Sequence, residues 1–257
     1  MEPSEKVGVI FDGTFEGFLT VLYKYYYEKL RPSELVAENG FQQSIGTKYV
    51  TVETDETQAE KALGGIQKKL GGVYGRICGA FINSDPTRYI HIFNYTILCF
   101  KHGEIADGYT HIDCVIRTYH YARQTGREIQ LLSGFTRFAE TAGGVMYADI
   151  SPEHEVLPML ADFFKDRLAG HKWVLHDTRR MTAAVCNGSD YIFTDAPELA
   201  VKIKTAEGEE RFQELWTLFY NTLAIKERTN PKLRRQLMPK RYWKHMTEHK
   251  IIDPRDL

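Results

Sequence analysis

The sequence has few cysteines, and no two of them are close together. They are spread along the chain and form no C-x-x-C pair: Cys78, Cys99, Cys114 and Cys186. This spacing excludes a zinc ribbon, a thioredoxin-type motif, a secreted disulfide framework and the closely spaced Cys triplet of a radical SAM iron–sulfur site. We therefore expect a reducing, cytoplasmic environment.

Long apolar runs and ligand-binding glycine motifs are absent as well. No run reaches the roughly 18–20 residues that cross a bilayer, and the polar, acidic residues 1–6 are not a signal peptide. The glycines of residues 71–75 lack both the preceding strand of a dinucleotide fingerprint and the Gly-Lys-Ser/Thr ending of a P-loop. No G-x-S-x-G elbow occurs. We expect no membrane contact, no cofactor and no metal.

What is present is the composition of a globular protein. The 257 residues are 43% hydrophobic and 12% aromatic, enough apolar surface to offset the chain entropy lost on folding. No repeat, low-complexity segment or long linker divides the chain. We therefore predict one compact α+β domain over residues 1–257.

The first half of the chain is predicted to be mainly helical. Residues 7–11 form an apolar strand, and Thr14 is placed to cap a helix with apolar side chains at i, i+3, i+4 and i+7. Residues 49–52 give a second strand. Helical periodicity then continues from about residue 55 to about residue 130, which predicts a helical subdomain or insertion.

Residues 135–195 have the pattern of an antiparallel sheet covered by one helix. Two short strands joined by a glycine-rich turn are followed by a helix and three further strands, an α+β order. Ser151 is predicted to cap the helix, with Pro152 at its first position.

The charge is unevenly distributed. Residues 226–250 carry nine Lys/Arg against two Glu, so this segment has a net charge of +7 and the rest of the chain −8, which the overall −1 hides. Cations bind phosphates and aromatic rings stack on bases, so a basic helical C-terminus with Tyr and Trp predicts nucleic-acid binding. The alternative is a solvated basic face. The candidate contact residues in this segment are Lys232, Arg234, Arg235, Lys240, Arg241, Tyr242, Trp243 and Lys244. Arg179, from a second basic pair that follows a strand, is a further candidate.

Weaker signals point to chemistry. His154 and Asp177, with Arg137 and Arg180, are candidates for a central cleft in which a histidine near a carboxylate acts as a general acid–base. The alternative is ordinary structural hydrogen bonding, which the sequence favours because adjacency alone does not place these groups in catalytic geometry. Residues 245–249 match the H-x-x-E-H zinc-peptidase pattern, but short motifs match often by chance and few residues follow to supply a third ligand.

The chain also resembles a known bacterial family. The resemblance rests on residues 11–19 (FDGTFEGFL), on a central group and on a C-terminal group. These two groups are Arg137, Phe138, Gly144, Tyr147, Ala148, Pro152, His154, Val156, Leu157, Pro158, Phe164, Arg167, Trp173, Asp177 and Arg180; and Trp216, Tyr220, Ile225, Arg228, Asn230, Met238, Pro239, Arg241, Tyr242, Trp243 and Glu248. They are similar to a domain family of unknown function that is called "probable DNA metabolism protein".

The resemblance implies a partner and a process, without a reaction. It implies association with a radical SAM protein of DNA repair or modification, and in other members fusion to a uracil-DNA-glycosylase-like domain, which we do not expect in this chain. We therefore predict a DNA-binding accessory protein of DNA metabolism or repair. Two alternatives stay open: a nucleic-acid-processing enzyme with a His/Asp/Arg cleft, and a protein-binding adaptor without DNA contact.

Overall fold

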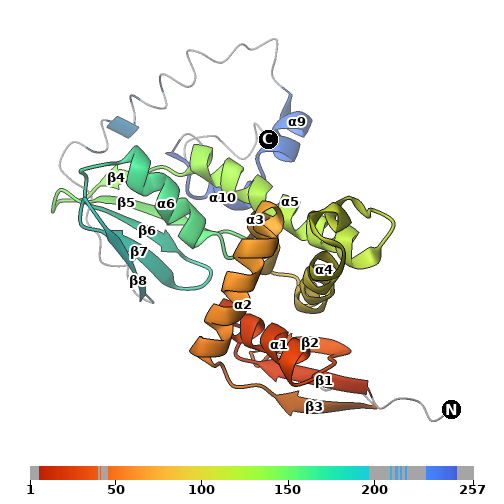
Figure 1. The fold of residues 1–257 in the computed structure, drawn as a ribbon. Helices are drawn as coiled ribbons and strands as arrows, with labels where there is room; N and C mark the ends of the chain where they lie inside the picture. Colours follow the sequence, from red (N-terminus) through yellow and green to blue (C-terminus); the bar gives the residue numbers. More distant parts are fainter. Residues whose placement is uncertain are drawn as a thin grey trace. The chain divides into compact units, whose positions relative to one another are not determined.

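A computed structural model describes most of the chain (Figure 1). The described residues are 6–39, 41, 46–196, 209, 212, 213, 215, 218 and 230–247. The chain divides into two compact units, residues 1–126 and 127–257. The single domain that the sequence predicts stays a prediction.

The first unit contains a small parallel sheet. Its strands β1 (Lys6–Phe11), β2 (Glu34–Ala37) and β3 (Thr47–Thr51) lie in the order β2-β1-β3. Helix α1 (Phe15–Tyr27) connects β1 to β2, and the Thr14 hydroxyl accepts the amide of Gly17 in the first turn of this helix at 3.0 Å. The predicted cap is therefore confirmed.

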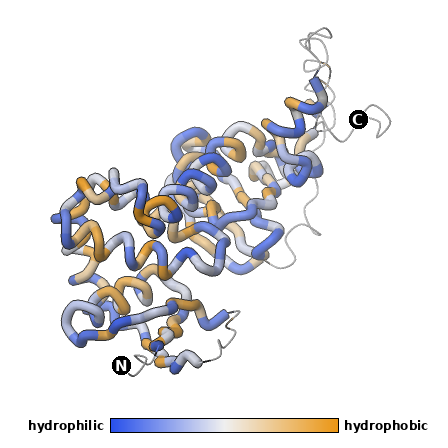
Figure 2. Tube along the Cα trace, turned by 90° about the vertical axis from the view of Figure 1, so that its right-hand side faces the viewer, coloured by the Kyte–Doolittle hydropathy of each residue, from blue (hydrophilic) through white to orange (hydrophobic). Residues whose placement is uncertain are grey.

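The helical region predicted from about residue 55 to about residue 130 is confirmed. It comprises α2 (Glu56–Lys69), α3 (Gly71–Phe81), α4 (Arg88–His102), the 3₁₀ turn η1 (Glu104–Gly108) and α5 (Asp113–Phe135). Apolar side chains at helical spacing form the core of the first unit, with Phe18, Ile77 and Phe93 almost wholly buried. In Figure 2 hydrophobic and hydrophilic residues alternate along these helices, as expected of amphipathic segments.

The second unit contains a five-stranded sheet beneath one helix. Helix α6 (Leu157–Arg167) packs its apolar side chains on this sheet. The strands follow each other in sequence order: β4 (Ala139–Glu140), β5 (Met146–Ile150), β6 (Trp173–Asp177), β7 (Thr182–Cys186) and β8 (Tyr191–Asp195). The α+β class and the mostly antiparallel sheet are as predicted. The exception is the pair β5–β6, which is parallel because α6 crosses between them.

The predicted start of α6 is wrong. The helix begins at Leu157, with Val156 as its cap residue and Pro158 in its first turn, rather than after Ser151. The hydroxyl of Ser151 bonds instead to Thr178 and His245. Residues 151–156 therefore form a loop beyond the carboxyl end of β5.

Two short helices lie in the basic segment. They are α9 (Pro231–Leu237) and α10 (Lys240–Trp243). Across the described residues, no helix combines the length and apolar character needed to span a membrane.

Candidate functional site

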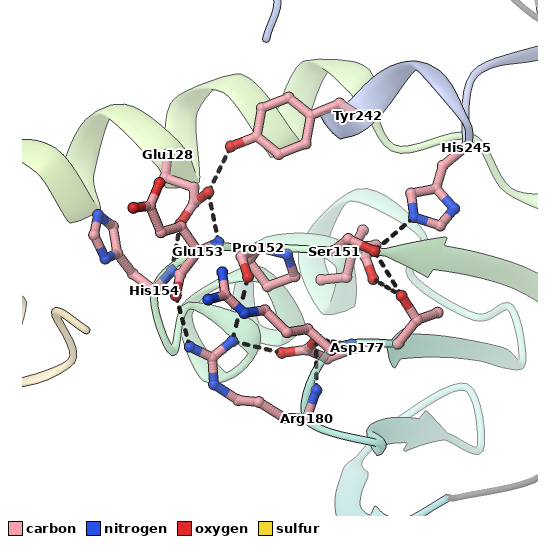
Figure 3. A network of polar contacts seen from close by, with 12 residues as sticks. Glu128, Ser151, Pro152, Glu153, His154, Asp177, Arg180, Tyr242 and His245 are labelled. Atoms are coloured by element: carbon pink, nitrogen blue, oxygen red, sulfur yellow. Dashed lines mark hydrogen bonds and ion pairs between the residues drawn. The ribbon is translucent and has the colours of Figure 1, made fainter. Parts of the chain in front are cut away.

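The candidate site lies at the carboxyl ends of the parallel strands β5 and β6. The loop 151–156 leaves β5 here and the turn 178–181 leaves β6. Loops at the carboxyl ends of parallel strands are the usual ligand-binding positions of such sheets. Helices α5 and α10 add side chains to the same place (Figure 3).

Glu128 of α5 is the centre of the polar network in Figure 3. Its side chain is 3% exposed, and its two oxygens accept backbone N–H groups of the 151–156 loop. The amide of His154 donates to Oε2 at 2.7 Å, and that of Glu153 donates to Oε1 at 2.9 Å. The carboxylate thus fixes the loop that follows β5.

The same carboxylate holds the basic segment. The Tyr242 hydroxyl donates to Oε1 of Glu128 at 2.5 Å, and Arg241 Nη2 donates to it at 3.0 Å. Arg241 also pairs with the carboxylate of Glu153 at 2.9 Å. Burial opposes ionisation of Glu128, but the amide of Glu153, the Tyr242 hydroxyl and the other donors outweigh it and lower its pKa. Helix α10 is therefore fastened by a buried, ionised carboxylate.

Asp177 and Arg180 form a second clamp. Asp177, at the end of β6, is fully buried, and its Oδ2 receives Arg180 Nη1 at 3.0 Å. Its Oδ1 accepts the amides of Arg179 and Arg180 at 2.9 and 3.2 Å. The Arg180 guanidinium also donates to the carbonyl of Glu153 at 2.9 Å. This clamp joins the turn after β6 to the loop after β5.

Ser151, Thr178 and His245 form a row of hydrogen bonds beside the clamp. Ser151 Oγ lies 2.6 Å from Thr178 Oγ1 and 2.8 Å from His245 Nε2. The Thr178 hydroxyl has a second acceptor in reach, the carbonyl of Ile150 at 3.0 Å, which already accepts the Thr178 amide. When the Thr178 hydroxyl donates to Ser151, Ser151 can donate to His245 Nε2, the arrangement of a serine nucleophile with a histidine base.

A further histidine, His176, pairs with the carboxylate of Asp149 on the face of the sheet that also carries Tyr147. His176 is 1% exposed, and its Nδ1 lies 2.9 Å from Asp149 Oδ1 and 3.0 Å from the Tyr147 hydroxyl. Its Nε2 is buried and has no hydrogen-bond partner among the residues that the structure describes. Sequence reasoning singles out His176 but expects its neighbour Asp177 as the carboxylate and misses Asp149, although polar residues at alternate positions 147, 149 and 151 of one strand are the signal of a polar sheet face.

The four predicted cleft residues are only partly brought together. Asp177 pairs with Arg180, and Arg180 reaches the carbonyl next to His154. The amide of His154 is bound by Glu128, and burial lowers the pKa of its imidazole, which favours the neutral ring at pH 7. Arg137 donates to the carbonyl of Gly134, at the end of α5. These contacts fix the loops around the site.

The residues predicted to bind nucleic acid divide into exposed and structural groups. Tyr242 is 2% exposed and bonded to Glu128, so its ring offers no face to a base. Arg241 is held by two carboxylates. The side chain of Arg234 lies outside the described residues. The exposed cations are Lys232, Arg235, Lys240, Lys244 and Arg179, and Arg241 is itself 42% exposed although both carboxylates hold it.

Trp243 is the half-buried aromatic residue of this segment. Its indole N–H donates to the carbonyl of Met238 at 3.0 Å, and the Lys240 ammonium lies 5.7 Å from its ring centroid. The predicted pairing of aromatic rings with cations is therefore present at both rings, since the Arg241 guanidinium lies 4.9 Å from the ring centroid of Tyr242, but the Tyr242 ring is buried and the Trp243 ring is only half-buried.

The H-x-x-E-H motif is only partly described. His245 bonds to Ser151, and Met246 is 1% exposed, whereas Glu248 and His249 lie outside the described residues. Among the residues that the structure describes, no group of three or more His, Cys, Asp or Glu side chains is arranged to hold a metal.

Comparison with known proteins identifies a family but no activity. Residues 86–248 match the sequence family described as "Domain of unknown function (DUF4130)". This range contains every side chain of the site described above. No curated protein matches the chain.

Proposed function

The chain belongs to the DUF4130 family, whose description assigns no function, and we propose from its site that it binds nucleic acid as an accessory protein of DNA metabolism or repair in the cytoplasm. The observation that carries the proposal is the anchoring of α10. A buried carboxylate fixes Arg241 and Tyr242 while the neighbouring Lys240 and Lys244 remain exposed.

The charge of this segment supports a polyanionic ligand. Residues 230–247 contain six Lys/Arg and no Asp/Glu, and Arg179 adds an exposed cation on the turn after β6. Lysine and arginine side chains that neutralise phosphates release counterions and supply most of the sequence-independent affinity for nucleic acid. A segment of one sign, held on a folded unit, is suited to such contacts.

The anchoring also limits the entropy lost on binding. An unattached basic tail must be ordered when it binds, at a cost in affinity. Here Tyr242 and Met246 are already buried, so the cations between and beside them need only restrict their side chains. The indole of Trp243 is half-buried with Lys240 beside it, and it is the ring that we propose contacts an unpaired base.

The process and the partner come from the resemblance to the "probable DNA metabolism protein" family. That resemblance supports work alongside a radical SAM protein of DNA repair or modification. The chain would bind DNA while the partner supplies the radical chemistry.

A salt series on the whole protein tests nucleic-acid binding. Binding to single-stranded, duplex and uracil-containing DNA is measured for the wild type, for Lys240→Ala with Lys244→Ala, and for the control Lys48→Ala with Lys101→Ala, two exposed lysines of the first unit. Removal of one phosphate-binding cation lowers the slope of log K against log salt by about 0.7–0.9. We expect the α10 variant to lower it by about 1.4–1.8 and the control to leave it unchanged.

Two results would overturn the proposal. One is the absence of binding at low salt, which would favour the protein-binding adaptor. The other is equal slopes for the α10 variant and the wild type. Arg241→Ala is unsuitable for this test because removal of the Arg241 side chain also breaks its hydrogen bond to the buried Glu128 carboxylate.

A second candidate function is an enzyme that cleaves nucleic acid, and the Ser151–His245 pair favours it. In this function Ser151 Oγ forms a bond to phosphorus while its proton passes to His245 Nε2, and the leaving oxygen later takes that proton. Incubation of labelled DNA with the wild type and with Ser151→Ala tests it. Cleavage by the wild type that Ser151→Ala abolishes would support the enzyme, and intact DNA in both would exclude it.

A further inference from the structure

A cluster of tyrosines lies exposed on α1, in the first unit of the chain. Tyr27 is 73% exposed and Tyr26 47%. Tyr27 stacks on Tyr23, with ring centroids 4.3 Å apart and planes inclined by 23°, and Tyr26 meets Phe100 of α4 edge to face. Hydrophobic burial would normally turn such rings inward, so an exposed row of them needs another explanation.

The rings border a hollow between α1 and α2. Its volume is about 200 Å³, and its floor and walls combine the tyrosines with Leu22, Ala62, Gly65 and Phe100. Gly65 leaves open the space that a side chain on α2 would fill, since the nearest side-chain atom to a Cβ there is 3.8 Å away. The hollow is smaller than the roughly 300–1,000 Å³ of drug-sized ligand sites, so it suits one planar ring.

Two lysines give the hollow its charge. Lys61 and Lys69 both line it, eight residues and hence about two helical turns apart on α2, and none of the described residues that line it carries a carboxylate. The ammonium of Lys61 lies 6.0 Å from the ring centroid of Tyr23. Stacked rings flanked by cations are the two components of a surface that binds single-stranded nucleic acid.

We propose that this surface, formed by Tyr23, Tyr26, Tyr27, Lys61 and Lys69 and here called the α1–α2 platform, binds single-stranded nucleic acid. One base enters the hollow and stacks on the ring of Tyr27 that lines it, and the two lysines contact the adjacent phosphates. The proposal shares its ligand with the proposed function, and in that respect rests on it, but it uses residues that lie before the family match at residue 86.

Another hollow beside α1 shows why charge decides the ligand. It has a volume of about 860 Å³, and its charged lining mixes both signs: Lys24, Lys29, Arg31, Glu28, Glu53 and Asp55. It therefore has no preference for a polyanion. The α1–α2 platform, in contrast, combines stacked rings with positive charge alone.

A fluorescent base reports stacking directly. An oligothymidine of about 15 nucleotides with one 2-aminopurine is titrated with the wild type, Tyr27→Ala, Tyr27→Phe and the control Tyr119→Ala, a tyrosine that is 51% exposed elsewhere in this unit. Stacking quenches 2-aminopurine, and the loss of one stacked base lowers affinity roughly 5- to 150-fold. We expect this loss and a loss of quenching in Tyr27→Ala, with both restored in Tyr27→Phe.

Two further variants separate the components of the α1–α2 platform. Gly65→Leu places a side chain in the hollow and should weaken quenching while leaving the helix intact, since leucine favours helix more than glycine does. Lys61→Ala with Lys69→Ala should lower the salt slope for this single strand by about 1.4, without changing the fold of the unit.

The outcomes distinguish this proposal from the proposed function. If Tyr27→Ala binds and quenches like the wild type while the α10 variant lowers the salt slope, the α1–α2 platform is excluded and the proposed function stands. If the α10 variant behaves as wild type while Tyr27→Ala loses affinity, the α1–α2 platform stands alone. A wild type that binds no oligonucleotide excludes both.

Discussion

Glu128 and Tyr242 lie 114 residues apart in the sequence, yet the Tyr242 hydroxyl donates to the Glu128 carboxylate over 2.5 Å. Both side chains are buried, at 3% and 2% exposure. Burial and the hydrogen bond to the negative carboxylate raise the pKa of the Tyr242 hydroxyl, because both favour the protonated phenol. Together with the bonds of Arg241 to Glu128 and Glu153, this hydrogen bond joins the middle of the chain to its basic segment.

Removing the charge of Glu128 should destabilise the second unit. In Glu128→Gln an amide NH₂ group replaces one of the two carboxylate oxygens. This NH₂ group is itself a donor and cannot accept the hydrogen bonds that the oxygen accepted, so buried N–H or O–H groups are left without an acceptor. We expect a loss of about 2–3 kcal/mol in the free energy of unfolding, measured by urea denaturation. Tyr242→Phe, which removes one hydrogen bond to a charged group, should cost about 1.5–3 kcal/mol.

Glu155→Gln is the matched control for Glu128→Gln, since Glu155 is exposed. Its unfolding free energy should stay within about 0.5 kcal/mol of the wild type. Equal stabilities of Glu128→Gln and Glu155→Gln would show that the buried network contributes nothing.

The stabilisation by Glu128 should depend on pH. Its pKa is lower in the folded chain than its ordinary value of about 4.5, so its contribution is complete above pH 4.5 and is lost as the pH falls through the folded-state pKa. The stability difference between the wild type and Glu128→Gln should therefore be constant near pH 7 and shrink in acid. Urea denaturation of both proteins from pH 7 to pH 3 measures it, and a difference unchanged at pH 3 would contradict the assignment.

Arg180 and Arg179 should have opposite roles. Arg180→Ala removes the cation from the fully buried Asp177 and a donor from the carbonyl of Glu153, so we expect a loss of about 2–3 kcal/mol in unfolding free energy. Arg179→Ala, at an exposed side chain, should leave stability within about 0.5 kcal/mol and weaken DNA binding. Thermal or urea unfolding and a DNA titration of both variants check this pair, and the reverse pattern would exclude it.

Local features of the fold are predictable from the sequence. The Thr14 cap and the helical region from residue 55 depend on neighbours within a few positions, and the structure confirms them. The start of α6 depends on distant residues. Ser151 is a good cap by composition, but its hydroxyl is taken by partners 27 and 94 residues away, Thr178 and His245.

The site is less predictable for the same reason. Composition identifies a basic and aromatic segment, but it does not say which cations face the solvent and which face a buried carboxylate. It groups Arg241 and Tyr242 with Lys240 and Lys244, and only the position of Glu128, 113 residues before Arg241, separates them. A lone glutamate within a helical pattern carries no mark of such a partner.

The span between Glu128 and Tyr242 also sets a time during synthesis. At about 5–20 residues per second, a ribosome that has added Glu128 adds the next 114 residues, up to and including Tyr242, in about 6–23 s. During that interval the nascent chain can already supply the amides of residues 153 and 154 to the carboxylate, but not the phenol or the guanidinium. The second unit therefore completes its polar core only after translation has passed residue 242, and until then Glu128 lacks two of its donors in the growing protein.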